Sequence, residues 1–192
     1  MTKNIFIKNL KGATGKTITS KALFNRLKEE TDSVELVSNI AGVVSETELE
    51  YIIYDVASGP APVTHTDSKG SSIFIFPTSL NTYSVGALSH LVADLDKEER
   101  LIIVQIEANN NSLRHEVLEK MNEKISHMDN VHFVDLSVEI QDDSITSDKE
   151  KTVGNDSIFS LEREEIESRI LAKLDQERNQ ELEQLVSLIK QA

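Results

Sequence analysis

The sequence predicts an α/β protein in which a parallel β-sheet is covered by helices on both faces. Short apolar runs alternate along the chain with segments of helical periodicity, which is the arrangement of repeated β–α units. The apolar runs are nearly continuous, as expected for strands that are buried on both sides. The chain of 192 residues is long enough for one domain with a sizeable core.

The first half of the chain begins with a predicted strand and a predicted helix. The run Ile5-Phe6-Ile7 is rich in β-forming residues, and apolar side chains then recur at intervals of three and four between Ile18 and Leu27. Proline and glycine within residues 57–70 predict a loop. Further strands are predicted at 34–37, 50–55 and 72–77.

The second half continues this alternation and ends in a helix. Ser84 is a candidate N-cap for a helix that carries apolar residues through Leu95. Residues 137–160 are acidic and serine-rich and are predicted to be mostly loop. A long helix, capped near Ser160, is predicted to close the chain. Strands at 101–106 and 131–136 and a helix at 113–125 complete the pattern.

The composition excludes several classes of protein. Without cysteine there is no disulfide framework, no thiolate metal site and no cysteine nucleophile. No apolar run approaches the roughly 18 residues of a membrane span, and the apolar part of the first segment is too short for a signal peptide. We therefore expect a cytoplasmic protein without a membrane association. The 20 basic and 33 acidic residues give a net charge of −13, which argues against a protein that coats DNA or anionic lipid.

A glycine-bearing segment lies between the first predicted strand and the first predicted helix. It reads KGATGKT over residues 11–17 and has the strand–loop–helix context of a phosphate-binding loop. Glycines let backbone N–H groups approach phosphate oxygens, and the helix N-terminus adds favourable charge. In such a loop Lys16 would contact the outer phosphates, and the Thr17 hydroxyl would ligate magnesium. The alternative is an ordinary β–α turn with chance lysines.

The spacing within this loop matches a variant of the phosphate-binding pattern. The common form G-x-x-x-x-G-K-[ST] requires glycine where this chain has Leu10, whereas the variant K-G-G-x-G-K-[ST] fits with one departure, at Ala13. The chain thereby resembles the deviant-Walker ATPases of the ParA/MinD group, and most of all the small plasmid-partition ATPases of the ParF kind.

Three further segments carry the same resemblance. Residues 51–59, YIIYDVASG, are similar to the family's Walker B strand and second switch. Residues 73–78, IFIFPT, resemble its "IIPV" strand, and residues 154–159, GNDSIF, resemble a late "GDSVF" segment. The similarity therefore spans most of residues 3–160 in the correct order.

The resemblance implies an ATPase that converts ATP to ADP and phosphate with Mg²⁺. Residues 1–160 would form a P-loop nucleotide-binding domain, and the C-terminal helix at 161–192 would pack on this domain or extend from it. Lys11 would reach across a dimer to the partner's nucleotide, so Lys11 and Lys16 are the candidate catalytic residues. Thr17 and Asp55 are the candidate magnesium ligands. The candidate nucleotide-binding residues are Lys11, Gly12, Ala13, Thr14, Gly15, Lys16, Thr17 and Ile18.

The family also implies a biological role and partners. A ParA-like protein would act in plasmid or DNA partition as an ATP-sandwich dimer or a higher assembly, together with a small centromere-binding, ParB-like protein. Such proteins usually bind non-specific DNA through basic residues, although the net charge of this chain opposes that. The basic residues that could form such a patch are Arg100, Arg114, Lys120 and Lys124.

The adenine-binding residues are less well defined. In the family the loops after the last two strands approach the adenine. This placement makes Glu107, Asn109 and Leu136 candidates, and a plain polar turn explains them equally well.

The segment after the second strand departs from the family. The family has D-x-D-P-Q there, whereas residues 38–42 read SNIAG and contain no acid. Because Ser38 and Ile40 replace groups that serve magnesium and position the attacking water, we expect nucleotide binding to survive while turnover slows. Glu46, Glu48 or Glu50 could substitute for the missing acids. Separately, Ala13 adds a methyl group to the loop, which is strained if its φ is positive.

Two other functions remain open. The chain could be a nucleotide-binding pseudo-ATPase switch whose hydrolysis is vestigial, which the missing acids favour. It could also be a related P-loop protein that serves conjugation or another positioning task. The spacing of the phosphate-binding loop favours the partition ATPase.

Overall fold

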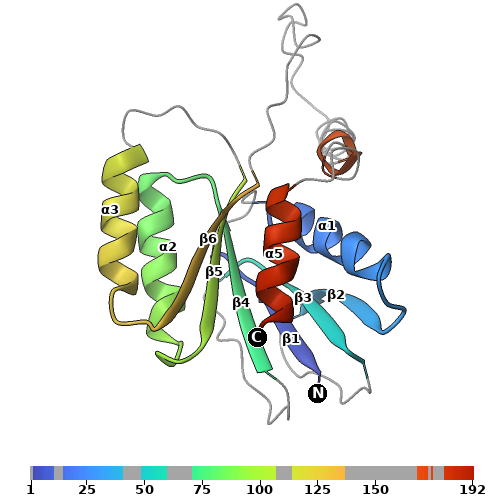
Figure 1. Cartoon of the computed structure of the whole chain (residues 1–192). Helices are drawn as coiled ribbons and strands as arrows, with labels where there is room; N and C mark the ends of the chain where they lie inside the picture. The colour runs from blue at the N-terminus through green and yellow to red at the C-terminus, as the bar shows by residue number, and fades with distance from the viewer. Residues whose placement is uncertain are drawn as a thin grey trace, which may run out of the picture.

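The computed structural model contains a single six-stranded sheet. It describes residues 2–10, 15–40, 49–59, 71–106, 114–136, 168–172, 174 and 180–192. The strands lie in the order β2-β3-β1-β4-β5-β6, and every neighbouring pair is parallel. The predicted parallel α/β sheet is therefore confirmed (Figure 1). The strands are β1 (Lys3–Ile7), β2 (Val34–Ile40), β3 (Tyr51–Val56), β4 (Ser71–Thr78), β5 (Arg100–Gln105) and β6 (Asn130–Asp135).

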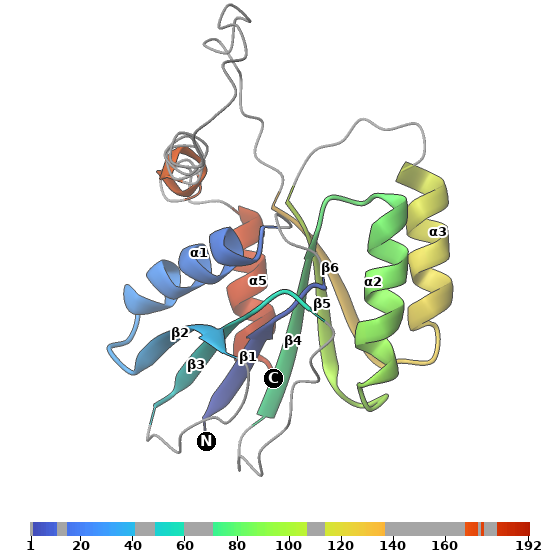
Figure 2. The same cartoon turned by 180° about the vertical axis from the view of Figure 1, so that it is seen from behind.

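Helices cover the sheet on both faces, as predicted. Helix α1 (Lys16–Lys28) and helix α5 (Gln180–Lys190) pack on one face, and α2 (Thr82–Ala93) and α3 (Arg114–Ile125) pack on the other. Figures 1 and 2 show these two pairs on opposite sides of the strands. Each face has its own core cluster, because successive residues of a strand point to opposite sides.

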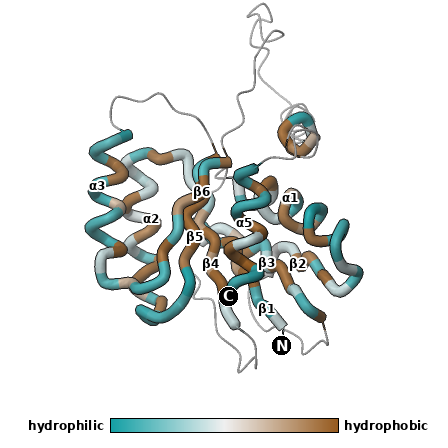
Figure 3. The backbone as a smooth tube through the Cα atoms, in the orientation of Figure 1, coloured by the Kyte–Doolittle hydropathy of each residue, from teal (hydrophilic) through white to brown (hydrophobic). Residues whose placement is uncertain are grey.

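The central strands show why their sequences are continuous apolar runs. All six residues of β3 are buried, and Ile5 and Phe6 of β1 belong to opposite core clusters. The ring of Phe6 stacks between Tyr54, at 4.9 Å, and Phe74, at 5.3 Å. Burial raises the pKa of Tyr54 to about 12, which keeps its hydroxyl protonated. Figure 3 shows the hydrophobic residues concentrated in these strands.

The start of α2 differs from the prediction. Asn81, and not Ser84, is the N-cap: its side chain accepts a hydrogen bond of 3.2 Å from the Ser84 backbone N–H. The Ser84 hydroxyl accepts one of 3.3 Å from the Asn81 N–H, which completes a reciprocal capping box. The apolar pattern located the helix, but the better capping residue lies one turn earlier.

The C-terminal helix is present but is shorter than the long helix predicted. Helix α5 has 11 residues, and helical residues at 168–172 and 174 precede it. Residues 161–167, 173 and 175–179 lie outside the described part of the chain, as does the predicted loop at 137–160. Within the described ranges, the structure contains no helix that is both long and apolar enough to cross a membrane.

Helix α5 is anchored at its C-terminal end by cations from the sheet. Lys3 donates hydrogen bonds to the carbonyls of Ile189 (3.1 Å) and Lys190 (2.5 Å), and Arg100 donates one of 2.6 Å to that of Leu188. Cations at this end also favour the negative pole of the helix dipole. The apolar face of α5 enters the core through Leu182, Leu185, Val186 and Ile189.

We expect Leu185→Ala to lower the free energy of unfolding by about 2–5 kcal/mol, because Leu185 is fully buried and the change leaves a cavity. Urea unfolding followed by circular dichroism measures the effect. Ser187→Ala, an exposed position on the same helix, is the matched control and should change stability by less than about 0.5 kcal/mol. Equal stability of the two variants would show that α5 does not belong to the cooperative core.

Candidate functional site

The carboxyl end of β1 lies at a switch point in the sheet. β1 leads to α1 on one face, whereas its neighbour β4 leads to α2 on the other face. The chain therefore diverges between these strands, and open α/β sheets bind ligands in the crevice that this creates. The Asn9 side chain donates a hydrogen bond of 2.8 Å to the Pro77 carbonyl and ties the two strand ends together.

Gly15 connects this edge to helix α1. It is the N-cap of α1 and has a φ of 82°, a conformation that side chains disfavour. A Cβ atom at Gly15 would lie 2.7 Å from Cγ1 of Ile106, which follows β5. Glycine is therefore required for two reasons, and its absent side chain lets the helix start against the end of β5.

The first turn of α1 suits an anion. Gly15 offers no side-chain cap to the first amides, and within the described residues no acid lies in this turn. Unpaired amides and the positive pole of the helix dipole attract negative charge. Two lysines are buried nearby in the chain, Lys8 just after β1 and Lys16 at the first helical position. Burial lowers the pKa of Lys8, and the charge of Asp94 partly opposes this shift.

Lys16 points toward the end of β3. Its side-chain Nζ donates a hydrogen bond of 2.7 Å to the hydroxyl of Ser58, which follows β3 by two residues. Only 8% of Lys16 is exposed, so its charge lies in a partly desolvated place. The next residue in the chain, Gly59, has a φ of 141°, a backbone conformation that glycine adopts readily.

Thr17 and Asp55 meet at the same edge. The Thr17 hydroxyl donates a hydrogen bond of 3.1 Å to a carboxylate oxygen of Asp55, although the residues are 38 positions apart. Asp55 is 8% exposed. A hydroxyl and a carboxylate are oxygen ligands of the kind that Mg²⁺ prefers, with phosphate and water oxygens completing its shell. In the described ranges no three acidic or histidine side chains form a metal cluster of their own.

Only part of the predicted loop falls within the described residues. Gly15, Lys16, Thr17 and Asp55 are brought together, whereas Lys11, Gly12, Ala13 and Thr14 lie outside the described residues. Ile18 is half-buried and packs against the core cluster of α1 and α5, so it presents no side chain to the site. Ile18 therefore remains a candidate for nucleotide binding only through its backbone N–H.

The strand register places Ser38 and Ile40, the two positions at which the resemblance implies acids. Ser38 of β2 is the direct partner of Asp55 in β3, and its side chain is exposed. Ile40 pairs with Val56 after an irregularity in the register. Glu50 precedes β3 and therefore lies at the opposite edge of the sheet, so it cannot replace an acid beside Asp55. Glu46 and Glu48 lie outside the described residues.

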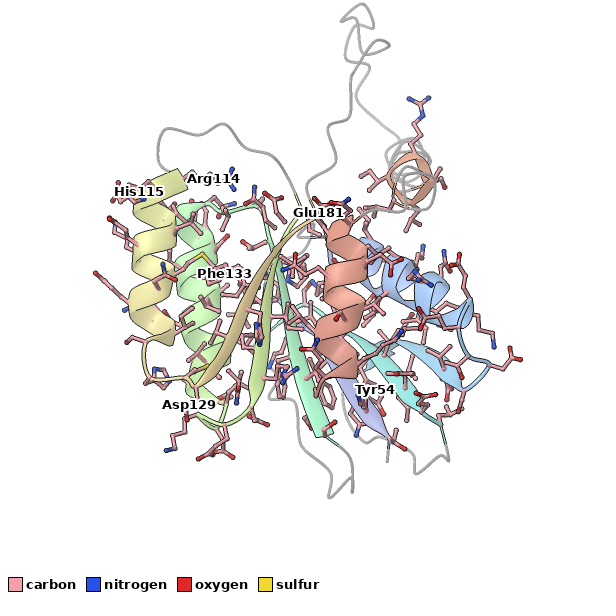
Figure 4. The ribbon with its side chains drawn as sticks, viewed as in Figure 1. Tyr54, Arg114, His115, Asp129, Phe133 and Glu181 are labelled. Carbon is pink, nitrogen blue, oxygen red and sulfur yellow. The ribbon has the colours of Figure 1, made fainter. Side chains whose placement is uncertain are left out.

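The other candidate residues do not gather at one place. Leu136 is buried in the core cluster of α1 and α5, while Glu107 and Asn109 lie outside the described residues. The four basic residues proposed as a DNA patch are also divided. Arg100 binds α5 at the amino edge, whereas Arg114 lies at the start of α3 (Figure 4), where it donates to Gln105 at 2.8 Å.

Sequence reasoning missed several residues of the site. Ser58 carried a weak signal, because it follows the strand that ends near Asp55. Ile106 and Asn9 carried none, since their roles depend on contacts with Gly15 and Pro77 that only the folded sheet creates.

Comparison of the sequence with known protein families and with curated proteins gives no match. The fold itself, a six-stranded parallel α/β sheet, is compatible with that of P-loop NTPases.

We expect Gly15→Ala to destabilise the protein by about 1–3 kcal/mol, because the new methyl group would be strained at positive φ and would collide with Ile106. Thermal and urea unfolding measure the change. The matched control is Gly86→Ala in α2, where an added Cβ meets nothing within 4 Å. It should stabilise the protein by about 0.5–1 kcal/mol.

The double variant Gly15→Ala/Ile106→Ala separates the two causes. It should lose less stability than the two single changes together, because the collision is removed while the backbone strain remains. Strict additivity of the single effects would show that the contact with Ile106 is not a constraint.

Proposed function

We propose that this chain binds Mg-ATP at the carboxyl edge of its sheet and acts as a ParA-like partition ATPase. The observation that carries the proposal is the hydrogen bond between Thr17 and Asp55, because it joins the loop–helix segment to the end of a second strand. A phosphate-binding loop needs this convergence, since its hydroxyl and a distant carboxylate serve the same metal ion. The proposed substrate is ATP and the products are ADP and phosphate.

The phosphates would be held by the start of α1. The amides that follow Gly15 would donate to the phosphate oxygens, and Lys16 would leave Ser58 to neutralise the outer phosphate charge. Ser58 gives the lysine a polar partner when no nucleotide is bound. Exchange of Ser58 for a phosphate oxygen couples nucleotide binding to the segment after β3.

Magnesium would be held between Thr17 and Asp55. The hydroxyl would ligate the ion directly, and the carboxylate would hold its water shell. The ion would neutralise charge that develops on the phosphates. In the chain itself, the hydrogen bond between these two side chains fixes their orientation toward the site.

Hydrolysis is proposed to be slow without a partner. Ser38 lies beside Asp55 in the register, where an acid would be close to the magnesium shell. Serine has no carboxylate to orient a water, so a nucleotide could be held without an aligned nucleophile. The same observation favours a second candidate function, a nucleotide-binding switch whose hydrolysis is vestigial.

The partners follow from the same resemblance. We propose a nucleotide-dependent homodimer through Lys11 and a small ParB-like protein that stimulates hydrolysis. Non-specific DNA is less well supported, because Arg100 is engaged with α5 and Lys120 forms an ion pair of 2.5 Å with Glu116. The net charge of −13 also opposes DNA binding.

We expect Lys16→Ala to abolish most nucleotide binding, because it removes the only side-chain cation proposed to touch the phosphates from the described residues. ATP with magnesium, at about one hundred times its dissociation constant, should stabilise the wild type by about 2.7 kcal/mol. Thermal unfolding with and without Mg-ATP measures this. Lys124→Ala, on the exposed side of α3, is the control and should keep the full stabilisation. An equal ATP-dependent shift in the wild type and in Lys16→Ala would refute the site.

We expect the purified wild type to release phosphate slowly and Ser38→Asp to release it faster. A misplaced nucleophile costs on the order of 100-fold in rate, and Ser38→Asp introduces a carboxylate beside Asp55. Phosphate release at saturating Mg-ATP measures the difference. Glu50→Gln should leave the rate unchanged, because Glu50 lies at the other edge. Rapid turnover by the wild type alone would direct attention to Glu46 and Glu48.

A further inference from the structure

Helix α1 carries the proposed nucleotide site at its start, and its apolar contact with the sheet is limited. Leu23 and Leu27 are the large apolar residues of α1 that are fully buried. The buried residues nearer to the start of the helix are small, namely Thr19, Ser20 and Ala22. Apolar packing has no preferred direction, so it holds α1 against the sheet but does little to fix the direction of its axis.

Polar and steric contacts fix α1 near both ends. At the start, the backbone of Gly15 lies against the side chain of Ile106. Near the other end, the Arg26 guanidinium donates hydrogen bonds of 2.5 and 3.0 Å to the two carboxylate oxygens of Glu183 in α5. A bidentate pair of this kind fixes an orientation as well as a separation. Only 23% of the Arg26 side chain is exposed, so water screens the pair less than it would a surface pair.

The partner of Arg26 belongs to a helix that is itself held on the sheet. Lys3 and Arg100 donate to carbonyls at the C-terminal end of α5, and the apolar face of α5 is buried in the core. Lys190 of α5 also forms an ion pair with Glu30, which accepts from Arg26 at 3.0 Å as well. Arg26 is therefore bound to a helix whose position is set by the sheet (Figures 1 and 2).

We propose that Arg26 is a positioning residue for the nucleotide site, an inference that rests on the proposed function. Its bidentate pair with Glu183 fixes the direction of α1 and thereby the places of Lys16 and Thr17. Arg26 follows Lys16 by roughly three helical turns, or about 15 Å, so it acts through α1 and not by touching the nucleotide. A displacement of about 1 Å at a reacting or binding group is enough to cost much of its effect.

The effect of changing Glu183 distinguishes positioning from a purely electrostatic role. If charge alone mattered, removal of the Glu183 carboxylate would strengthen the binding of an anionic nucleotide. Positioning predicts the opposite, because Arg26 would lose its partner in α5. Removal of Arg26 weakens binding on both accounts, so the sign of the Glu183 effect decides between them.

Titration calorimetry with Mg-ATP tests the proposal. Arg26→Gln and Glu183→Gln should each bind on the order of tenfold more weakly than the wild type. The double variant should bind no more weakly than either single variant, because both changes break one interaction. Arg26→Lys keeps the charge but loses the fork, so it should recover only part of the affinity. Lys28→Gln is the matched control and should bind like the wild type, since the ion pair of Lys28, of 3.1 Å, is with Asp32.

Val117→Ala separates positioning from a general loss of stability. Val117 is buried in α3 on the other face of the sheet, so this variant should unfold more easily while its dissociation constant for Mg-ATP stays unchanged. The same loss of affinity in Val117→Ala as in Arg26→Gln would overturn the proposal. Wild-type or tighter binding by Glu183→Gln would also overturn it.

A measurement without nucleotide keeps the test separate from that of ATP binding. In proton–nitrogen correlation spectra, Arg26→Gln and Glu183→Gln should move the backbone amide signals of Lys16 and Thr17, whereas Lys28→Gln should leave them in place. A wild type that does not bind Mg-ATP would refute the proposed function, and these spectra would still decide the positioning role. Unmoved signals at both residues in both variants would overturn it.

Discussion

The close contact between Gly15 and Ile106 is the constraint on which the candidate site depends. Lys16 and Thr17 follow Gly15 directly, so their directions are set by where the helix begins. A side chain at position 15 would push α1 away from the end of β5, because a Cβ would lie 2.7 Å from Ile106. The position of the candidate site is thus determined by the packing of the Gly15 backbone against the Ile106 side chain, which sets where Lys16 and Thr17 lie.

Stability alone does not explain why a lysine occupies position 16 in the same turn. Lys16 occupies the first position of α1, where its charge opposes the positive pole of the helix, and it is almost fully buried. Its Nζ donates a hydrogen bond to the hydroxyl of Ser58, which is a neutral partner. Local conflicts of this kind concentrate at functional sites. An anion bound before the helix would turn both unfavourable features into favourable ones.

The sequence predicted the elements that depend on local pattern and missed those that depend on contacts. Apolar periodicity located the strands and α1, although α1 begins at Lys16, so Lys16 and Thr17 are helical and not part of the loop that the sequence predicted over 11–17. The sequence predicted Ser84 as the N-cap of α2, because serine at a helix start is a strong local signal. In the structure Asn81, one turn earlier, forms the cap. The length of the terminal helix and the role of Ile106 could not be predicted, since both depend on distant packing.

The β2–β3 register supports the proposal that this chain binds a nucleotide and hydrolyses it slowly. The groups proposed to bind, Lys16, Thr17 and Asp55, are buried or hydrogen-bonded in the fold, so each is also part of the structure around α1. Ser38 lies beside Asp55 on an edge strand and is exposed, so its identity is hardly constrained by packing. In the proposed site, the residue at position 38 can therefore change without disturbing the groups proposed to bind. On this proposal binding and turnover are separable, because the groups proposed to bind belong to the core around α1 whereas position 38 lies exposed on an edge strand.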